Sequence, residues 1–318
     1  MSGPTLITGS AGFIGSHLAE ALLARGDQVV GVDDFDPTYD PALKERNLEG
    51  PRSRAGFHFE RLDVRDADAL QALLAARGIR RVAHLAARGG VRPSVEDPEI
   101  YADINVRGTQ SVLQACLASG VEQVVFASSS SVYGARDGGT FHESDAADRP
   151  ASPYAATKRS GELLCYAAFH DHGLPVTCLR FFTVYGPRQR PDMAIHRFLE
   201  QLEAGRPLTI NGDGLQRRDF TYVDDIVAGF VAALERPDGY AIYNLGSGRE
   251  VTVLELVAAL QEAAGLEGRL EHGPAHASDV PHTRADIGLA RRVLGWEPRV
   301  RLEEGLSRFV AWYRQRPG

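Results

Sequence analysis

A tyrosine and a lysine stand four residues apart, at Tyr154 and Lys158. Positions i and i+4 of a helix share a face, so the phenol and the ammonium project together. A free tyrosine has a pKa near ~10 and is a poor base, but a nearby positive charge favours its phenolate. Lysine occurs only here and at Lys44 in a chain with 35 Lys and Arg residues, which indicates a need for a compact charge. The pair predicts proton exchange with a substrate hydroxyl; the alternative is an ordinary helical pair without chemistry.

A run of four serines follows the apolar residues 124–127. Hydroxyls at the C-terminal end of a parallel strand face the crevice where ligands bind. We choose Ser129 as the hydroxyl that hydrogen-bonds the reacting oxygen. Ser128 and Ser130 remain alternatives, because the sequence does not determine where each side chain points. A serine-rich turn that only caps the backbone would explain one or two of the four.

Glycines recur with the spacing G-x-x-G-x-x-G at Gly9, Gly12 and Gly15, after an apolar segment. Gly9 permits a tight turn, Gly12 lets a pyrophosphate approach the backbone, and Gly15 lets a helix pack on the strand. The N-terminus of that helix offers free N–H groups to phosphates. Asp33 stands roughly the ~20 residues downstream expected of an acid that binds a ribose 2′-OH and repels a 2′-phosphate. The pattern predicts NAD rather than NADP, with Asp34 as the alternative acid and a purely structural turn as the alternative for the loop.

Other residues of the expected dinucleotide site open the first helix or end the third and fourth strands. They are Phe13, Ile14, Asp63, Val64, Leu85, Ala86 and Ala87. The pair at 63–64 lies where an adenine edge is expected, and the small residues after 84 leave room for a flat ring.

The segments that must position these residues alternate in character along the first 180 residues. We expect strands at 4–8, 28–33, 57–63, 81–86, 123–128 and 175–180, and helices at 16–25, 67–77, 99–119 and 153–172. This rhythm predicts an α/β fold of the Rossmann type, with a doubly wound parallel sheet and right-handed crossovers. Residues 1–180 form the predicted NAD-binding domain. Residues 181–318, with helices at 223–234 and 253–263, form a smaller α/β substrate-binding lobe, and some chain crosses back.

Composition bounds the remaining possibilities. The chain has 318 residues, 43% apolar and 24% charged, which is typical of a globular protein of two lobes. A net charge of −7 without a basic run excludes an electrostatic footprint for nucleic acid or an anionic membrane. We expect no secretory signal, and no window of ~18 apolar residues predicts a membrane span.

The cysteines and histidines suggest no metal. Cys116, Cys165 and Cys178 are odd in number and lie in apolar segments, which predicts buried thiols in a reducing cytoplasm. His170 and His172 are spaced i,i+2, which does not suit metal ligation on a helix.

With these residues in hand, the chain resembles the extended short-chain dehydrogenase/reductase family, the nucleotide-sugar epimerases and dehydratases. The resemblance covers nearly the whole chain, and within the family the UDP-glucuronate 4-epimerase branch is most similar. It is carried by the glycine loop, the Ser/Tyr/Lys set, Asn105 and the runs at 39–44, 84–87, 90–94, 180–194 and 218–225.

The resemblance implies a reaction and further site residues. Tyr154 would take the proton of the sugar 4-OH, with C4 oxidised by a tightly bound NAD and the hydride returned to the other face of a 4-keto sugar. Arg218 matches the diphosphate-binding arginine of the family. The other predicted substrate-binding residues are Arg92, Thr183, Arg188, Met193, Ala194 and Arg284. Arg92 would contact the sugar carboxylate or stabilise a loop, and Thr183 with the serines would hold that carboxylate against decarboxylation.

Three other functions remain as alternatives. A UDP-glucose/galactose 4-epimerase has the same catalytic set but binds a neutral hexose. UDP-glucuronate decarboxylases and dehydratases usually carry an acid where this chain has Ser131, which disfavours them. NAD-sensing proteins of this fold often lack the Tyr or the Lys. Helices at 99–119 and 153–172 resemble the dimer-forming pair of the family and predict a homodimer.

Overall fold

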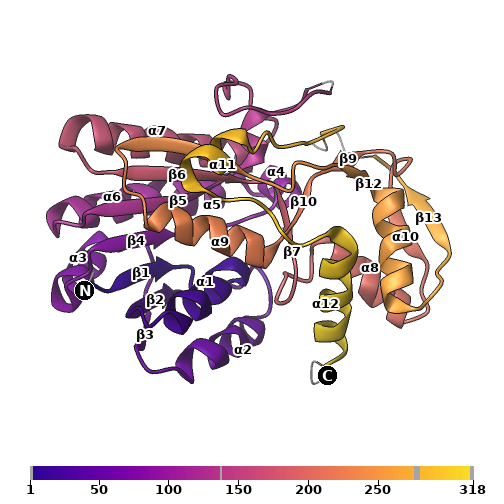
Figure 1. Ribbon diagram of the computed structural model, residues 1–318, viewed down its shortest axis with the longest axis horizontal. Coiled ribbons are helices and arrows are strands. Elements are labelled where there is room, and N and C mark those ends of the chain that lie inside the picture. Colours follow the sequence, from indigo (N-terminus) through magenta and orange to yellow (C-terminus); the bar gives the residue numbers. More distant parts are fainter. Residues whose placement is uncertain (1–2, 137, 276–279, 316–318) are drawn as a thin grey trace.

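The computed structural model describes residues 3–136, 138–275 and 280–315, and a seven-stranded parallel sheet forms its centre (Figure 1). The strand order is β11-β6-β5-β4-β1-β2-β3, and each neighbouring pair is parallel. The strands are β1 (Thr5–Thr8), β2 (Val29–Asp33), β3 (Phe57–Arg61), β4 (Arg81–His84), β5 (Gln123–Ser129), β6 (Val176–Phe181) and β11 (Tyr240–Leu245). The order reverses between β1 and β4, which is where ligands bind in open α/β sheets. The predicted doubly wound sheet is confirmed.

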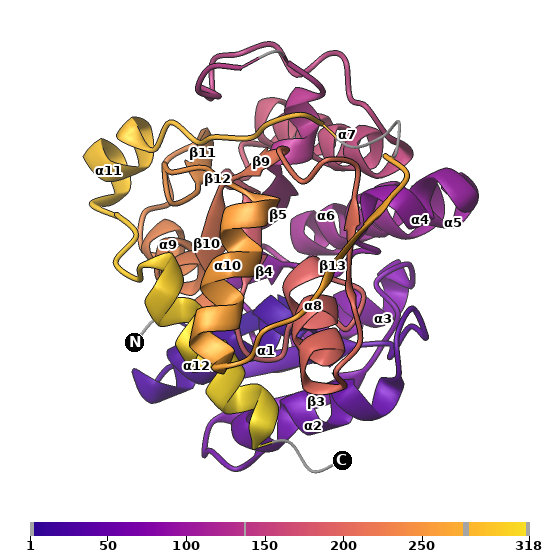
Figure 2. The ribbon, with the colours of Figure 1, turned by 90° about the vertical axis from the view of Figure 1, so that its right-hand side faces the viewer.

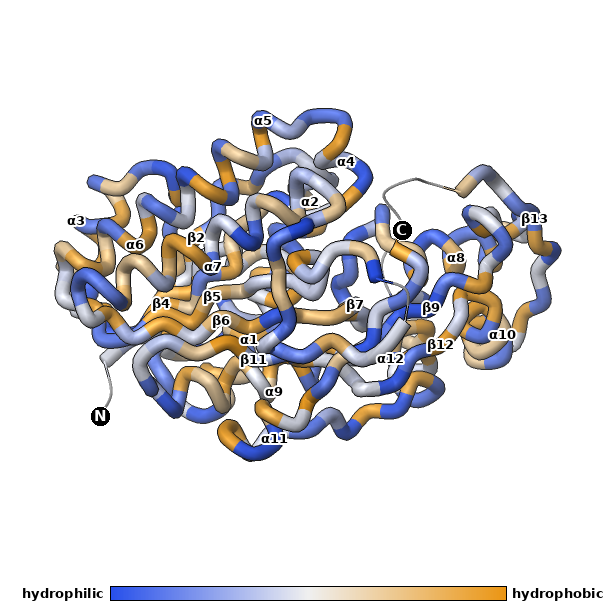
Figure 3. Tube along the Cα trace, turned by 90° about the horizontal axis from the view of Figure 1, so that it is seen from above, coloured by the Kyte–Doolittle hydropathy of each residue, from blue (hydrophilic) through white to orange (hydrophobic). Residues whose placement is uncertain are grey.

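Helices cover both faces of the sheet, because successive strand residues point to opposite faces. Ile7 and Val125 pack on the side of α1 (Phe13–Ala24) and α9 (Val223–Leu234). Leu6 and Val124 pack on the side of α3 (Ala67–Arg77), α6 (Gly108–Ala118) and α7 (Pro153–His172). The central strands are therefore mainly apolar, as Figure 3 shows around β4, β5 and β6. Such strands are expected of a parallel sheet buried on both faces.

The helix that carries the tyrosine and lysine has well-defined ends. Ser152 accepts a hydrogen bond from the Ala155 N–H (3.2 Å), Pro153 is the first helical residue, and Gly173 ends the helix in the left-handed conformation. These are standard signals for a helix start and stop. The predicted range 153–172 is confirmed.

The helix predicted over 99–119 is interrupted. It consists of α5 (Pro98–Tyr101), a π-helical turn (Ala102–Arg107) and α6, and it follows the short α4 (Val91–Glu96). Asn105 lies in the π turn and bonds both the N–H and the carbonyl of Arg88 (2.7 and 3.0 Å) and the hydroxyl of Thr157 (3.0 Å). Turns of this type are frequent at functional sites; here the turn ties the loop after β4 to α7.

A second group of elements lies beyond the carboxyl edge of the sheet (Figure 2). It contains α8 (Ala194–Glu203), α10 (Val253–Ala264), α12 (Leu302–Arg314) and the two-stranded pairs β7–β10, β9–β12 and β8–β13. Those strands are β7 (Thr183–Tyr185), β8 (Leu208–Asn211), β9 (Arg217–Arg218), β10 (Phe220–Tyr222), β12 (Val251–Thr252) and β13 (Leu270–Gly273). The C-terminal part of the chain also contributes to the main sheet. It supplies the edge strand β11 and the helix α9, which packs on one face of the sheet, and α11 (Gly288–Leu294) packs against both. The division at residue 180 stays a prediction.

The buried side chain of His84 should make the stability of the fold depend on pH. Its Nδ1 lies 2.7 Å from the Thr8 hydroxyl and its Nε2 lies 3.0 Å from the Thr109 hydroxyl, which itself donates to the Asn105 carbonyl. Nε2 must therefore carry the proton, and the ring is neutral. Burial lowers the pKa of His84 to about 3.

The unfolded state therefore binds a proton at His84 between about pH 6.5 and pH 3 that the folded state does not. Stability from this group is present above pH 6.5 and is lost as the pH falls, at about 1.4 kcal/mol per pH unit. Urea unfolding between pH 7 and 4 should show a shallower pH slope for His84→Gln than for the wild type. Equal slopes would contradict the assignment.

Candidate active site

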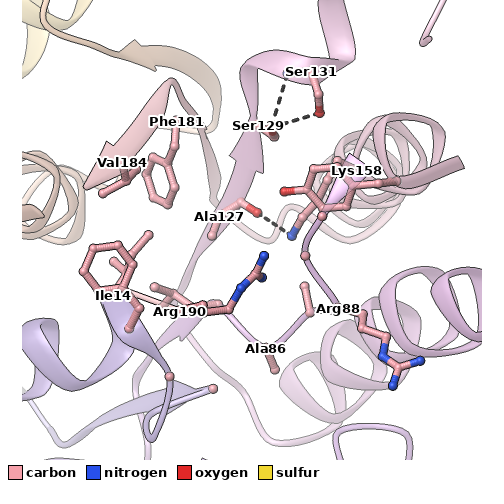
Figure 4. A pocket seen from close by; sticks show the side chains of 18 of the residues that line it. Ile14, Ala86, Arg88, Ala127, Ser129, Ser131, Lys158, Phe181, Val184 and Arg190 are labelled. Atoms are coloured by element: carbon pink, nitrogen blue, oxygen red, sulfur yellow. Dashed lines mark hydrogen bonds between the residues drawn. The ribbon is translucent and has the colours of Figure 1, made fainter. Parts of the chain in front are cut away.

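A cavity of about 500 Å³ opens at the carboxyl ends of β1, β2, β4 and β5 and is closed on its far side by the second group of elements. Figure 4 shows the part around Lys158, with Ile14 and Ala86 on one side and Phe181 and Val184 on another. The cavity brings together the glycine loop after β1, the serine run at the end of β5 and the Tyr/Lys pair on α7. This is the position that the switch point of the sheet predicts.

The glycine loop is shaped for a phosphate. Gly9 has a φ of +71°, and a Cβ there would lie 2.9 Å from the Ala86 nitrogen. A Cβ on Gly15 would lie 2.2 Å from the Gly9 carbonyl oxygen. Gly12 caps α1 without a side-chain hydrogen bond, so the first-turn N–H groups remain available to an anion. This cradle fits the pyrophosphate of a dinucleotide.

Asp33 ends β2 beside this loop and is held by three donors. Its carboxylate accepts from the Ala11 N–H (3.2 Å) and the Phe35 N–H (2.9 Å) and pairs with the Lys44 ammonium (3.2 Å). Both members of this ion pair are buried. Lys44 lies on α2 (Pro41–Arg52), a helix that the sequence analysis did not expect. Asp34 also lines the cavity, so both carboxylates remain candidates for the ribose. A carboxylate at this position fits NAD, because it can accept hydrogen bonds from the ribose hydroxyls.

The Tyr/Lys pair lies at the bottom of the cavity. The Lys158 ammonium donates to the Ala127 carbonyl (2.9 Å), and burial lowers its pKa to about 8. Burial raises the pKa of Tyr154, while a hydrogen bond with Ser129 and the charge of Arg190 lower it. We expected Lys158 and an oxidised nicotinamide to favour the phenolate. In the structure the protein groups that lower the pKa of Tyr154 are the hydroxyl of Ser129 and the guanidinium of Arg190.

The serines point in different directions. Ser129 accepts hydrogen bonds from the Ser131 hydroxyl (2.9 Å) and the Ser131 N–H (3.2 Å) (Figure 4). Its own proton is therefore free to be directed at Tyr154. Ser128 donates instead to the Glu162 carboxylate (2.6 Å), although it also lines the cavity with Ser130. The geometry therefore favours Ser129 for the contact with the reacting oxygen, which stays a prediction.

Most predicted residues line this cavity, including every one assigned to the cofactor and, for the substrate, Thr183, Met193 and Arg218. Four do not: Arg92, Arg188, Ala194 and Arg284. Arg188 has a φ of +65° and binds Glu20 of α1 (2.6 Å). Arg284 bonds the Gly248 carbonyl (3.2 Å) and lines a second cavity.

The other two lie on helices at the rim of the cavity. Arg92 is in α4, where its guanidinium faces the side-chain amide of Asn211. Ala194 begins α8 and is exposed. Arg92, Arg188, Ala194 and Arg284 are therefore not among the residues that line the main cavity, and their assignment to the substrate stays a prediction.

The sequence analysis missed Arg190, Arg88 and Tyr39, which line the cavity. Arg190 forms a two-pronged ion pair with Asp192 (2.9 and 2.9 Å) and extends into the cavity toward Lys158 (Figure 4). One feature of the sequence indicated a role for Arg190, namely its place in the run 180–194 that carries the family resemblance. Arg88 bonds the Thr38 hydroxyl (2.9 Å) and so crosses from the loop after β4 to the loop after β2.

Two further features are absent from the described residues. No group of three or more His, Cys, Asp or Glu side chains among them could hold a metal ion. No helix among them is both long and apolar enough to span a membrane. The three cysteines are free and buried, as predicted.

The fold and this cavity define a dinucleotide-dependent enzyme of nucleotide sugars, and the chain belongs to the NAD dependent epimerase/dehydratase family, whose model matches residues 5–246. It is 43% identical to the UDP-glucuronate 4-epimerase of Thermodesulfobacterium geofontis, over 98% of this chain and 96% of that relative. Among solved structures, it is similar to the UDP-glucuronic acid 4-epimerase of Bacillus cereus in complex with UDP-glucuronic acid and NAD, with a TM-score of 0.93 and 39% identity over 98% and 99% of the two chains. The UDP-glucose 4-epimerase of Thermotoga maritima matches with a TM-score of 0.91 and 32% identity over 98% and 99%.

Proposed function

We propose that this protein interconverts UDP-glucuronate and UDP-galacturonate by NAD-dependent 4-epimerisation. The observation that carries the proposal is the hydrogen-bonded set of Tyr154, Ser129 and Ser131 in the same cavity as the glycine loop. Full-length similarity to named UDP-glucuronate 4-epimerases supports the choice of substrate.

Each group of residues in the cavity has a separate role in the proposed reaction. NAD, when bound, supplies a reversible hydride acceptor for C4. Tyr154 takes the proton of the 4-OH and returns it after the 4-keto sugar has turned, while Ser129 donates to the reacting oxygen. Arg218 lines the cavity from β9, which supports its assignment to the diphosphate. Gly9, Gly12 and Gly15 hold the dinucleotide against β1.

One observation favours a uronic acid over the neutral hexose of the nearest alternative. Arg190 brings a guanidinium into the cavity close enough to lower the pKa of Tyr154. A charge at that place stabilises a sugar carboxylate and gains nothing from a neutral hydroxymethyl group. The decarboxylase alternative requires an acid where Ser131 instead donates to Ser129.

Product analysis tests the proposal. The purified enzyme is incubated with UDP-glucuronate and, in parallel, with UDP-glucose, and the anomeric protons are followed by NMR. We expect UDP-galacturonate from the first and far slower conversion of the second. Conversion of UDP-glucose at an equal or higher kcat/KM would contradict the substrate assignment.

Thr183 tests the role proposed for the carboxylate contacts. Its backbone is fixed by a hydrogen bond to the Asp219 carbonyl (3.0 Å), so Thr183→Ala removes only the hydroxyl from the cavity. When that hydroxyl no longer holds the carboxylate, the bond between the sugar ring and the carboxylate can leave the plane of the 4-ketone. Out of that plane the bond overlaps with the π orbital of the ketone, and carbon dioxide can be lost. We expect a rise of several-fold in UDP-pentose per turnover, measured by NMR. An unchanged ratio would contradict the role; Thr209→Ala, on β8, is the control.

We also propose that the protein is a cytoplasmic homodimer. Leu163 and Tyr166 on α7 are 54% and 49% exposed, and Val95 on α4 is 57% exposed. Large apolar side chains gathered on exposed helices mark contact surfaces, and three unpaired thiols suit a reducing compartment. Light scattering should give twice the chain mass, and Leu163→Arg combined with Tyr166→Arg should halve it. A monomeric wild type would contradict the dimer.

A further inference from the structure

Glu162 continues the row of catalytic side chains on α7. It follows Tyr154 and Lys158 at the same four-residue spacing, so it lies on the same face one turn further along. Its side chain has no exposed surface. The catalytic steps proposed above make no use of it.

Four hydrogen bonds surround this buried carboxylate. Arg180 of β6 donates through Nε and Nη2 (2.8 and 2.8 Å), and Arg159 of α7 donates through Nη1 (2.8 Å). Ser128, at the end of β5, donates its hydroxyl proton (2.6 Å). A buried carboxylate persists only when its oxygens are fully paired in this way. The contacts tie α7 to β5 and β6 directly behind the catalytic pair.

The arginine is held as firmly as the acid. Arg180 is 2% exposed, and its guanidinium lies over the Tyr133 ring at 4.6 Å. Tyr133 in turn donates to the Asn244 side chain on β11 (2.7 Å). The carboxylate therefore has a fixed position relative to three strands of the sheet.

We propose that Glu162 is a positioning residue that places a fixed negative charge one turn from Lys158 on the same face of α7 and holds the Ser128 end of β5 behind Tyr154, with Arg180 as its anchor. The assignment rests on the proposed epimerase function, because it gives Lys158 a task in that reaction. It extends the functional row on α7 from two residues to three.

The charges around Lys158 support this assignment. Burial lowers the pKa of Lys158 to about 8, and Glu162 and Cys165 on α7 oppose that shift. His84 of β4 faces the ammonium but is neutral, since burial lowers its own pKa to about 3. Arg180, Arg159, Tyr240 of β11 and Cys165 face Glu162. Cys165 and Glu162 are the two groups that raise the pKa of Lys158, and Glu162 is the carboxylate of the two, so its removal lowers the pKa of the ammonium further.

The composition of the chain makes a direct test possible. Lys44 and Lys158 are the only lysines, so a protein labelled with ¹³Cε-lysine gives two signals, and Lys44→Arg assigns them. The NAD-loaded full-length chain is titrated from pH 6 to 11. We expect the Lys158 midpoint in Glu162→Gln to lie below that of the wild type by about one pH unit or more.

The matched control is Glu143→Gln. Glu143 is another partly buried acid near Arg180, but its carboxylate accepts from the Asn244 N–H (2.8 Å) and it is not among the groups that act on Lys158. We expect no change in the Lys158 midpoint. The alkaline limb of the kcat–pH profile should move to lower pH in Glu162→Gln only.

An unpaired Arg180 could prevent Glu162→Gln from folding, because breaking a buried pair is strongly destabilising. The double variant Glu162→Gln/Arg180→Met removes both charges and is expected to show a downward shift that is smaller than in Glu162→Gln, because a positive charge is removed as well. A Lys158 midpoint equal to that of the wild type, in either variant, would overturn the proposal and leave Glu162 with a role in stability alone. The NMR titration does not depend on turnover, so its result is separate from the test of the epimerase function.

Discussion

Replacement of Tyr154 by Phe is expected to lower kcat for epimerisation by about 10²–10⁴-fold, the range typical of a lost general acid–base group. The variant keeps the ring, its edge contact with Tyr101 (6.3 Å between centroids) and the helix that carries it. It removes only the oxygen that hydrogen-bonds Ser129. KM should change little, because the phenol contributes mainly when the proton moves.

The measurement is kcat and KM for UDP-glucuronate by NMR or a coupled assay, with bound NAD quantified in the same samples. Tyr166→Phe, an exposed tyrosine on the same helix, is the matched control and should retain wild-type kcat. Turnover of Tyr154→Phe within tenfold of the wild type would show that another group moves the proton.

Substitution of Gly15 by Ala is expected to abolish cofactor retention. The added methyl carbon would lie 2.2 Å from the Gly9 carbonyl oxygen and 3.1 Å from the Ser10 Cα. Both contacts are backbone atoms of the phosphate loop, so the loop must move away from α1, and its N–H groups no longer point at one phosphate. We expect NAD affinity to fall by about 100-fold or more, since several charge-assisted hydrogen bonds are lost together.

Calorimetric titration of the NAD-free protein measures this effect. The matched control is Gly273→Ala on β13, where the nearest atom to a new Cβ is 3.6 Å away; its NAD affinity should equal that of the wild type. Wild-type affinity in Gly15→Ala would mean that the dinucleotide does not use this loop.

The elements that could be predicted from sequence are those whose signals are local. α7 and α3 were predicted with their observed bounds because each begins at a capping side chain, Ser152 or Asp66, and ends at a left-handed glycine. The glycine spacing similarly indicated the phosphate loop, because its requirements are met within a few residues.

The features that sequence did not reveal depend on distant partners. α2 has a low proportion of apolar residues, and its Lys44 is buried only because Asp33 lies beside it. Ser128 lines the cavity but donates its hydroxyl proton to Glu162, 34 residues later. Arg188 is predicted from sequence to bind the substrate, and its contact with Glu20, 168 residues away, could not be foreseen. Such pairings are tertiary and leave no mark on local spacing.

The central claim is that the hydrogen at C4 is removed and given back to the opposite face within one active site. UDP-glucuronate carrying deuterium at C4 tests it most directly, with the UDP-galacturonate product analysed by NMR and mass spectrometry. We predict that the product retains the deuterium at C4 and that a parallel reaction of unlabelled substrate in D₂O introduces none there. Loss of the label to solvent, or solvent deuterium at C4, would contradict the account.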